Sequence, residues 1–119
     1  MKNGLVIDPD GSKHWWVDGK RHRTDGPAVE WITGSKRWYV DGKLHRTDGP
    51  AIDRPDGSRE WYVDGKRHRL DGPAIEDADG TIGWWVNGMQ YDSNKSFQQA
   101  AGLSDERMAM LVLKHGDVG

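Results

Sequence analysis

One spacing constrains this chain more than any other feature: tryptophans recur every 23 residues, at Trp15, Trp38, Trp61 and Trp84. Two more residue types keep the same register, namely Val17, Val40, Val63 and Val86, and Gly19, Gly42, Gly65 and Gly88. A fixed period of this length predicts an array of one supersecondary unit, in which neighbouring units bury what one unit cannot. A surface on which the same residues are repeated several times favours binding over catalysis, because a catalytic centre needs its residues only once.

The composition sets limits on this array. A chain of 119 residues is expected to form one domain with a modest core, to which seven tryptophans would contribute large buried areas. The absence of cysteine excludes disulfides and thiolate metal sites. Residues 1–8 carry no long apolar run, so we expect no signal peptide, no membrane partner and a cytoplasmic location.

Charge is divided unevenly along the chain. Residues 13–69 hold 13 Lys and Arg against 9 Asp and Glu, whereas residues 70–119 hold 3 against 8. The two halves could orient a polar partner through their long-range fields. Closely mixed charges also describe an ordinary solvated surface, and both interpretations remain open at this point.

Each unit is predicted to contain two short strands joined by glycine turns. Residues 57–63 form a β-rich run that is entered at Asp56-Gly57 and left at Asp64-Gly65. Asp-Gly between such runs is the strongest short signal for a hairpin. The partner strand is expected at Pro50-Ala51-Ile52-Asp53. The chain should therefore run up and down as an elongated antiparallel meander.

Strand alternation predicts two aromatic rows on opposite faces of the sheet. The first row is Trp15, Trp38, Trp61 and Trp84, which we interpret as structural. The second row is Trp16, Tyr39, Tyr62 and Trp85, which either packs or binds a partner.

The pattern ends in the fourth unit, which suggests an array over residues 1–91 and a helical cap over residues 92–119. Ser93 is predicted to begin a helix that runs through Ala101 and ends at Gly102.

Ser104 is predicted to begin a second helix that ends at Gly116. Its apolar face contains Met108, Leu111 and Val112. This face would either cover the last rung of the sheet or form a homodimer interface.

Three units carry a His-Arg-x-Asp-Gly-Pro-Ala segment. Its leading residues are His22, Arg23, His45, Arg46, His68 and Arg69, and its acidic residues are Asp25, Asp48 and Asp71. Each Asp can accept hydrogen bonds in a turn while it pairs with an Arg, which would make the edge of the array rigid. Alternatively the Arg and His side chains form a rim that binds an anionic partner, since the planar guanidinium can hold a carboxylate or phosphate.

Metal binding and catalysis are not indicated. Each unit adds two strands, so equivalent histidines should lie about 10 Å apart, too far to share one zinc ion. We find no nucleophile motif and no histidine with a unique carboxylate partner, and we expect neither a metal, nor a cofactor, nor an enzyme.

Aromatic rows beside arginines could also bind nucleic acid, a nucleotide or a glycan, through Trp16, Tyr39 and Tyr62 with the three arginines of the segment. The formal net charge of −2 argues against nucleic acid, because strong nucleic-acid binders carry a basic excess. This binding mode is retained as the alternative function.

The stretch 61–68, followed by Gly72 and by Asp79-Gly80-Thr81, resembles the MORN repeat. The resemblance spans residues 5–91 and implies a single-layer antiparallel β solenoid of four units, closed by a C-terminal helical cap and acting as a protein-interaction scaffold. Arg23, Arg46 and Arg69 stand where MORN units usually place Gly, which argues against transferring membrane or phosphoinositide binding to this chain.

The His-Arg-x-Asp-Gly-Pro-Ala variant is similar to repeats in small proteins of tailed bacteriophages and large DNA viruses. Choline-binding and glucan-binding repeats share the aromatic hairpins but lack this segment. The resemblance thus suggests a phage-encoded protein. Together with the repeated surface, the missing catalytic set and the missing targeting signal, it leads us to expect a non-enzymatic protein that binds and modulates a host or viral protein. The small size and the suspected origin suggest a counter-defence inhibitor as one example.

Overall fold

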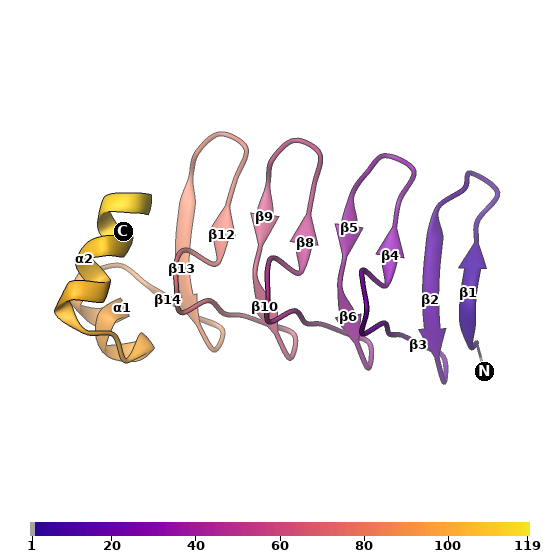
Figure 1. The fold of residues 1–119 in the computed structure, drawn as a ribbon, viewed down its shortest axis with the longest axis horizontal. Helices are drawn as coiled ribbons and strands as arrows, with labels where there is room; N and C mark the ends of the chain where they lie inside the picture. The colour runs from indigo at the N-terminus through magenta and orange to yellow at the C-terminus, as the bar shows by residue number, and fades with distance from the viewer. Residues whose placement is uncertain (1) are drawn as a thin grey trace.

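The computed structural model describes residues 2–119 and is mainly antiparallel β structure, followed by two helices (Figure 1). The principal sheet contains β1 (Gly4–Ile7), β2 (Lys13–Val17), β3 (Lys20–Arg21), β4 (Val29–Glu30), β5 (Lys36–Arg37), β8 (Ile52–Asp53), β9 (Arg59–Glu60), β12 (Ile75–Glu76), β13 (Ile82–Val86) and β14 (Met89–Tyr91). Its order is β1-β2-β4-β5-β8-β9-β12-β13-β14, with β3 paired to β2, and the predicted antiparallel fold is confirmed.

Two small hairpins continue the lower edge of this sheet: β6 (Tyr39–Val40) with β7 (Lys43–Leu44), and β10 (Tyr62–Val63) with β11 (Lys66–Arg67). The run 57–63 is therefore split into β9 and β10 at Trp61, and the partner strand predicted over 50–53 shortens to Ile52–Asp53. Pro50 has no N–H to donate to a neighbouring strand, which explains why pairing begins only after it.

Positive backbone angles mark the hairpin turns that the Asp-Gly pairs predicted. Asp41 has a φ of 51° and Gly42 a φ of 78°. Positive φ at both central residues is the type I′ geometry that matches the twist of paired strands. Asp18, Asp64 and Asn87 have φ values of 50°, 51° and 49° and are likewise followed by glycines with positive φ.

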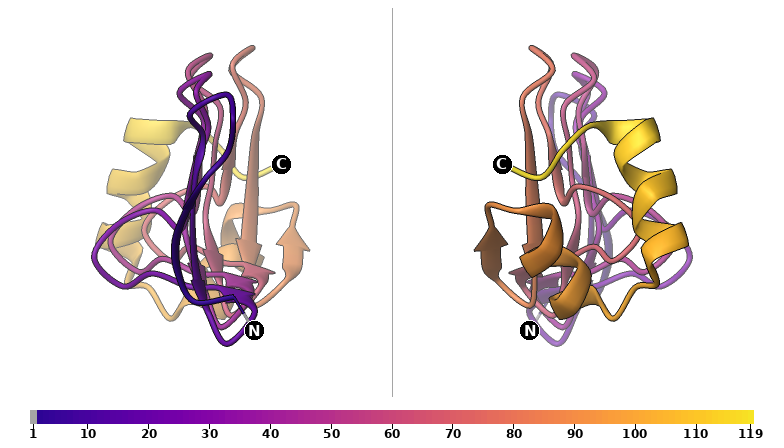
Figure 2. Two further views of the ribbon diagram at one scale, coloured as in Figure 1. Left: turned by 90° about the vertical axis from the view of Figure 1, so that its right-hand side faces the viewer. Right: turned by 90° about the vertical axis from the view of Figure 1, so that its left-hand side faces the viewer.

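Between successive hairpins the chain leaves the sheet and arches over one face. We call these segments arch 1 (22–28), arch 2 (45–51) and arch 3 (68–74). The ends of arch 1 are both fixed to Trp15, whose N–H donates to the Ala28 carbonyl at 2.8 Å and whose carbonyl accepts the His22 N–H at 3.0 Å. The same pair of bonds fixes arch 2 to Trp38 and arch 3 to Trp61. All three arches project from the same side of the sheet as α2 (Figure 2).

Backbone and side-chain hydrogen bonds connect neighbouring hairpins at both edges. At one edge the Gly42 N–H donates to the Arg21 carbonyl at 2.9 Å, and Gly65 and Gly88 repeat this bond 23 and 46 positions later. At the other edge the buried Ser12 hydroxyl accepts the Ile32 N–H at 3.0 Å, and Ser58 accepts the Ala78 N–H at 3.3 Å. These bonds hold the hairpins in register.

The helices begin and end where the sequence predicted. α1 (Asn94–Ala101) starts after Ser93, whose hydroxyl accepts the Ser96 N–H, and ends at Gly102 in the left-handed conformation. α2 (Asp105–His115) starts after Ser104, whose hydroxyl accepts the Arg107 N–H, and ends at Gly116. No helix within residues 2–119 is long and apolar enough to cross a membrane.

The principal hydrophobic cluster lies where the helices meet the last strands. It contains Trp84, Val86, Phe97, Met108, Leu111 and Val118, with Val112 packed against it. Met108 and Leu111 thus cover the end of the sheet, as one of the two predictions for this helix required. Along the rest of the sheet and the arches the fully buried residues include the small or β-branched Ala28, Val29, Ala51 and Ala74, together with Ser12 and Pro73.

Candidate interaction surface

The arch face carries a stack of arginine on tryptophan in each arch. The Arg23 guanidinium lies 3.9 Å above the ring centroid of Trp15, and the pairs Arg46 with Trp38 and Arg69 with Trp61 have the same distance. These three tryptophans are half-buried, whereas Trp84 is only 1% exposed. The predicted structural row is therefore covered by cations in the arches and by hydrophobic residues only at the last rung.

Each of these arginines also holds its arch closed. Arg23 Nε donates to Asp25 Oδ1 at 2.8 Å, and Nη1 donates to the Pro27 carbonyl at 3.1 Å. The same bonds join Arg46 to Asp48 and Pro50, and Arg69 to Asp71 and Pro73. We call this arrangement the arginine clamp. The predicted Arg–Asp pairs are present, and two of the five N–H donors of each arginine side chain are used within its own arch.

The clamps alter the acidity of their carboxyl groups. Hydrogen bonding and charge attraction from Arg23 lower the pKa of Asp25 below its ordinary value of 3.8, and Arg46 lowers the pKa of Asp48 in the same way. These two clamps therefore persist to acidic pH.

The histidines of the segment connect one hairpin to the next. His45 Nδ1 accepts the backbone N–H of Asp64 at 3.1 Å, which leaves Nε2 to carry the proton of the neutral ring. His22 and His68 form the equivalent bonds with Asp41 and Asn87, both at 3.0 Å. This contact was not predicted from the sequence, although each histidine precedes its partner by a constant 19 residues.

Two hollows separate the arches. One has a volume of about 530 Å³ and lies between arches 1 and 2, and the other has a volume of about 540 Å³ and lies between arches 2 and 3. The floor of the first is Trp38 and Val40, and that of the second is Trp61 and Val63. The walls are formed by Arg23, Thr24, Asp25, Gly26, His45, Arg46, Thr47 and Asp48 in the first hollow, and by Arg46, Thr47, Asp48, Gly49, His68, Arg69, Leu70 and Asp71 in the second. Each hollow thus combines an apolar floor with charged walls.

The third position of this series is covered by α2. A Cβ atom on Gly72 would lie 3.0 Å from His115 Nε2, and the Trp84 ring meets Phe97 at 4.8 Å and His115 at 5.9 Å between centroids. Trp84 and Val86 are the floor residues here, and both are buried. The side of arch 3 that corresponds to the open hollows is consequently in contact with the helical region.

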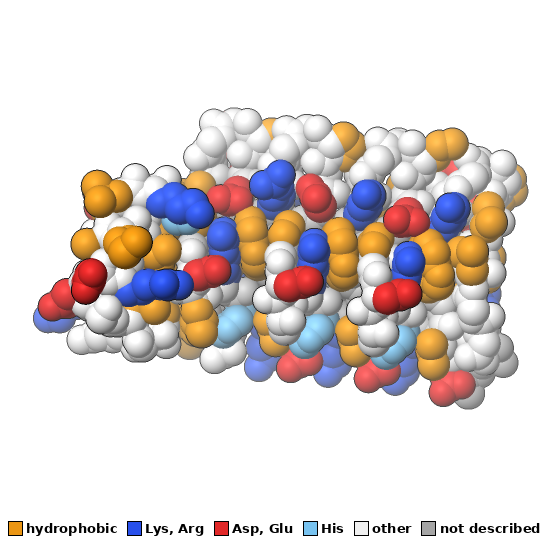
Figure 3. All heavy atoms as spheres, viewed as in Figure 1, with side chains coloured by type: hydrophobic (Ala, Val, Ile, Leu, Met, Phe, Trp, Pro, Cys, Tyr) orange, Lys and Arg blue, Asp and Glu red, His pale blue; other side chains and the backbone are white. Residues whose placement is uncertain are grey.

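A row of alternating charges crosses the arch face above the arches, and blue and red side chains alternate there in Figure 3. Cross-strand register gives its order as Lys13, Glu30, Lys36, Asp53, Arg59 and Glu76. Opposite charges on facing strands stabilise each other modestly when exposed. Net charge per segment does not reveal this alternation, which appears only when the strand register is known.

The second aromatic row lies on the opposite face, which we call the rear face, and it is interleaved with arginines. Arg21 lies 5.4 Å from the Trp16 ring and 5.8 Å from that of Tyr39. Arg67 lies 5.8 Å from Tyr62 and 5.0 Å from Trp85. The chain's own cations therefore occupy ring faces that a base or sugar would need.

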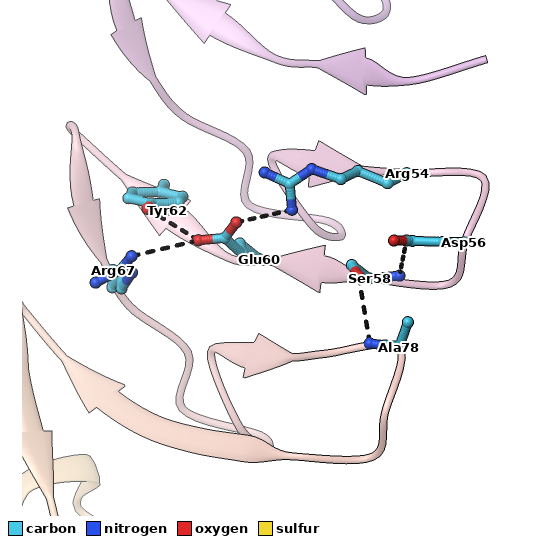
Figure 4. Close-up of polar contacts among 7 residues, drawn as sticks. All are labelled: Arg54, Asp56, Ser58, Glu60, Tyr62, Arg67 and Ala78. Atoms are coloured by element: carbon cyan, nitrogen blue, oxygen red, sulfur yellow. Dashed lines mark hydrogen bonds and ion pairs between the residues drawn. The ribbon is translucent and has the colours of Figure 1, made fainter. Parts of the chain in front are cut away.

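A polar cluster surrounds Glu60 on the rear face (Figure 4). Its carboxylate accepts hydrogen bonds from Arg54 Nη1 at 3.0 Å and from the Tyr62 hydroxyl at 3.2 Å, and lies 3.5 Å from Arg67 Nη2. Burial, followed by the Glu60 charge, raises the pKa of Tyr62 above 10.0. Glu60 is paired with cations on two sides and serves to order this face.

Within residues 2–119, no group of three or more His, Asp or Glu side chains could hold a metal ion. The structure thus brings His45, Arg46, His68 and Arg69 together around the hollows, and places Trp16, Tyr39, Tyr62 and Trp85 on the other face. Comparison of the chain with protein-family models, with curated proteins and with solved structures finds no match.

Proposed function

We propose that this protein is a non-enzymatic protein-interaction module, a MORN-like solenoid of four units over residues 1–91 with a helical cap over residues 92–119. It binds a host or viral protein and modulates it, and we propose a bacteriophage origin and a role as a counter-defence inhibitor. The observation that carries the binding role is the pair of equivalent hollows on the arch face, each with a Trp and Val floor and charged walls.

Rigidity of the arches supports this proposal. Each arch is fixed by two backbone bonds to one tryptophan and by an arginine clamp. A surface that is already ordered loses less conformational entropy when a partner binds. The binding residues we propose are His45, Arg46, His68 and Arg69 in the walls, with His22 and Arg23 extending the same rim.

Nucleic-acid, nucleotide or glycan binding through the rear face has less support. Arg21 and Arg67 already lie against the aromatic rings of that row. Binding there would quench tryptophan fluorescence during a titration with oligonucleotides, nucleotides or glycans, and a flat titration is the result we expect.

A homodimer through α2 is a separate proposal. Met108 and Leu111 are buried within the chain, but Met110 is 60% exposed and Leu113 is 88% exposed on the same helix. A second copy would have to use these two side chains. A sedimentation coefficient that is lower for Leu113→Glu than for the wild-type protein would support the dimer. Sedimentation of both the wild type and the variant as monomers would exclude it.

The test of the proposed function is capture of a partner followed by reconstitution with two purified components. Thr47 lines both hollows and is exposed, so Thr47→Trp should abolish binding. Ala78→Trp is the matched control, because Ala78 is exposed at a hairpin end and lines neither hollow. A partner that binds both variants equally would show that the arch face is not the binding surface.

A further inference from the structure

Equivalent residues show what α2 does to arch 3. The side chain of Arg69 is 14% exposed, against 23% for both Arg23 and Arg46. Gly72 is buried, whereas Gly26 and Gly49 are half-buried. Each arch has one side that faces away from the N-terminus. In arch 3 this side contacts helical side chains, and in arches 1 and 2 it borders an open hollow.

Spacing decides what can enter the open hollows. Successive arches are separated by two strands, or about 10 Å. A whole helix is about 10 to 12 Å wide and does not fit between them. α2 reaches arch 3 because no further arch follows it within residues 2–119. At arches 1 and 2 a partner can therefore insert side chains, but not an element of secondary structure.

The same spacing selects the partner's secondary structure. Residues i and i+7 of a helix lie on one face and are about 10.5 Å apart along the axis, which matches neighbouring hollows. Residues on one face of a strand are about 6.6 or 13 Å apart, which matches neither. Two anchors on one helix can thus reach both hollows at once.

We propose that the partner contributes an amphipathic helix that crosses the arches and inserts one side chain into each hollow, from positions i and i+7. This inference rests on the proposed function and names the kind of partner segment that the arch face binds. The helix runs across the strands, with Thr47 of arch 2 between its two anchors, because Thr47 lines both hollows.

The contacts of His115 indicate the chemistry of the anchors. Its ring meets Gly72 and Trp84, and Nδ1 lies 3.9 Å from Glu76 Oε1. The residues at the equivalent places beside the hollow between arches 2 and 3 are Gly49, Trp61 and Asp53. A flat ring with an N–H group, such as the imidazole of histidine, can lie against the glycine and the tryptophan with that N–H group on the side of the carboxylate. We therefore assign histidine, or another flat side chain with an N–H donor, to positions i and i+7.

The test uses a stapled helical peptide with histidines at i and i+7 and the ¹⁵N-labelled full-length protein. We expect saturable shifts of the Gly26 and Gly49 amide signals and of the Trp38 and Trp61 indole signals, with little change at Gly72. The control peptide has the same composition, with histidines at i and i+5 on different sides of the helix. Because it reaches only one hollow, it should bind at least about tenfold more weakly.

Two variants assign the sites. Thr24 lines only the hollow between arches 1 and 2, so Thr24→Trp should reduce binding to the level of the control peptide. Thr47→Trp should remove it. Equal affinity for the two peptides, shifts confined to the rear face, or no shift at any peptide concentration would overturn the proposal. The proposed function could still stand in that case, if the purified partner binds wild type and not Thr47→Trp through a segment that is not helical.

Discussion

Trp38 and Trp84 occupy equivalent positions, yet they are covered in opposite ways. Trp38 lies half-buried beneath the Arg46 guanidinium, at 3.9 Å, with open space beside it. Trp84 is 1% exposed and packs against Phe97 and the helices. One tryptophan is thus covered by a polar group that belongs to its own arch, and the other by apolar groups from residues outside the 23-residue pattern.

The difference shows how stability is divided in this molecule. An arginine clamp closes with residues at most twelve positions from the tryptophan it covers, so every arch can carry its own cover without a second layer. The last rung has no arginine at the corresponding position and relies on hydrophobic burial, which is worth more per residue. We therefore expect the helical region to contribute most to global stability and the clamps to hold local structure.

The largest effect should follow from opening the hydrophobic cluster. Phe97 is 0% exposed and meets the Trp84 ring edge-on, so Phe97→Ala leaves a cavity beside that ring. We expect a loss of about 3 to 5 kcal/mol in the free energy of unfolding, measured by urea denaturation. The matched control is Leu113→Ala on the exposed side of α2, which should change stability by less than about 0.5 kcal/mol. Equal effects of the two substitutions would mean that the helices do not stabilise the sheet.

A smaller effect is expected when one clamp is removed. Arg46→Ala exposes Trp38 and leaves the Pro50 carbonyl without its donor, for a loss of about 1 to 3 kcal/mol. The Asp48 partner is well exposed, so the ion pair itself should add little.

Arg46→Lys separates charge from shape. Lysine keeps the positive charge but cannot donate through the planar fork to Asp48 and Pro50 together. We expect it to recover less than half of the stability lost in Arg46→Ala, and to restore neither the Trp38 indole chemical shift nor the closed arch. Full recovery by lysine would show that charge alone covers the ring.

Much of this architecture could be predicted from the sequence, because its signals are local. Asp64-Gly65 predicted a hairpin turn, which has positive φ at both positions, and Ser104 with Gly116 predicted both ends of α2. The Arg–Asp pair was predictable because its members are two residues apart.

The contacts that were not predicted depend on the three-dimensional course of the chain. Sequence alternation placed Trp38 on one face, but nothing in it shows that Arg46 folds back over the ring or that a hollow remains beside it. The contact between His45 and Asp64 spans 19 residues and needs the stacking of hairpins to be known. The covering of ring faces on the rear face by Arg21 and Arg67 was missed for the same reason.

Removal of one inter-hairpin contact should have a still smaller effect. His45→Ala deletes the acceptor of the Asp64 N–H, which lies at the exposed edge where water can replace it. We expect a loss of about 0.5 to 1 kcal/mol, together with faster amide exchange at Asp64. The exchange rate at Asp41, which bonds to His22, serves as the internal control and should stay unchanged. Faster exchange at both positions would show that the hairpins open together rather than singly.

The smallest effect is expected from a change of pH, to which the arginine clamps and the helical cover of Trp84 should respond in different pH ranges. Burial, followed by the Arg69 charge, lowers the pKa of His115 below 6.5; Lys114 also lowers it, and Glu76 and Asp71 oppose the shift. A ring whose folded pKa is depressed takes up its proton more readily when unfolded, so its contribution to stability is present above pH 6.5 and declines as the pH falls below that value.

The clamps should respond only at much lower pH. Because the folded pKa values of Asp25 and Asp48 lie below 3.8, their contribution is complete above that pH and is lost as the pH falls through the folded values. As the pH falls from 6.5 towards 3.8 we expect the Trp84 indole signal to shift while those of Trp15 and Trp38 stay in place, as followed by two-dimensional NMR. The glutamine side chain of His115→Gln cannot be protonated in this range, so this variant should abolish the shift of the Trp84 signal and leave the Trp15 and Trp38 signals unchanged. Simultaneous movement of all three indoles would mean that a single titration controls both kinds of cover, and the division between clamps and helical region would then be wrong.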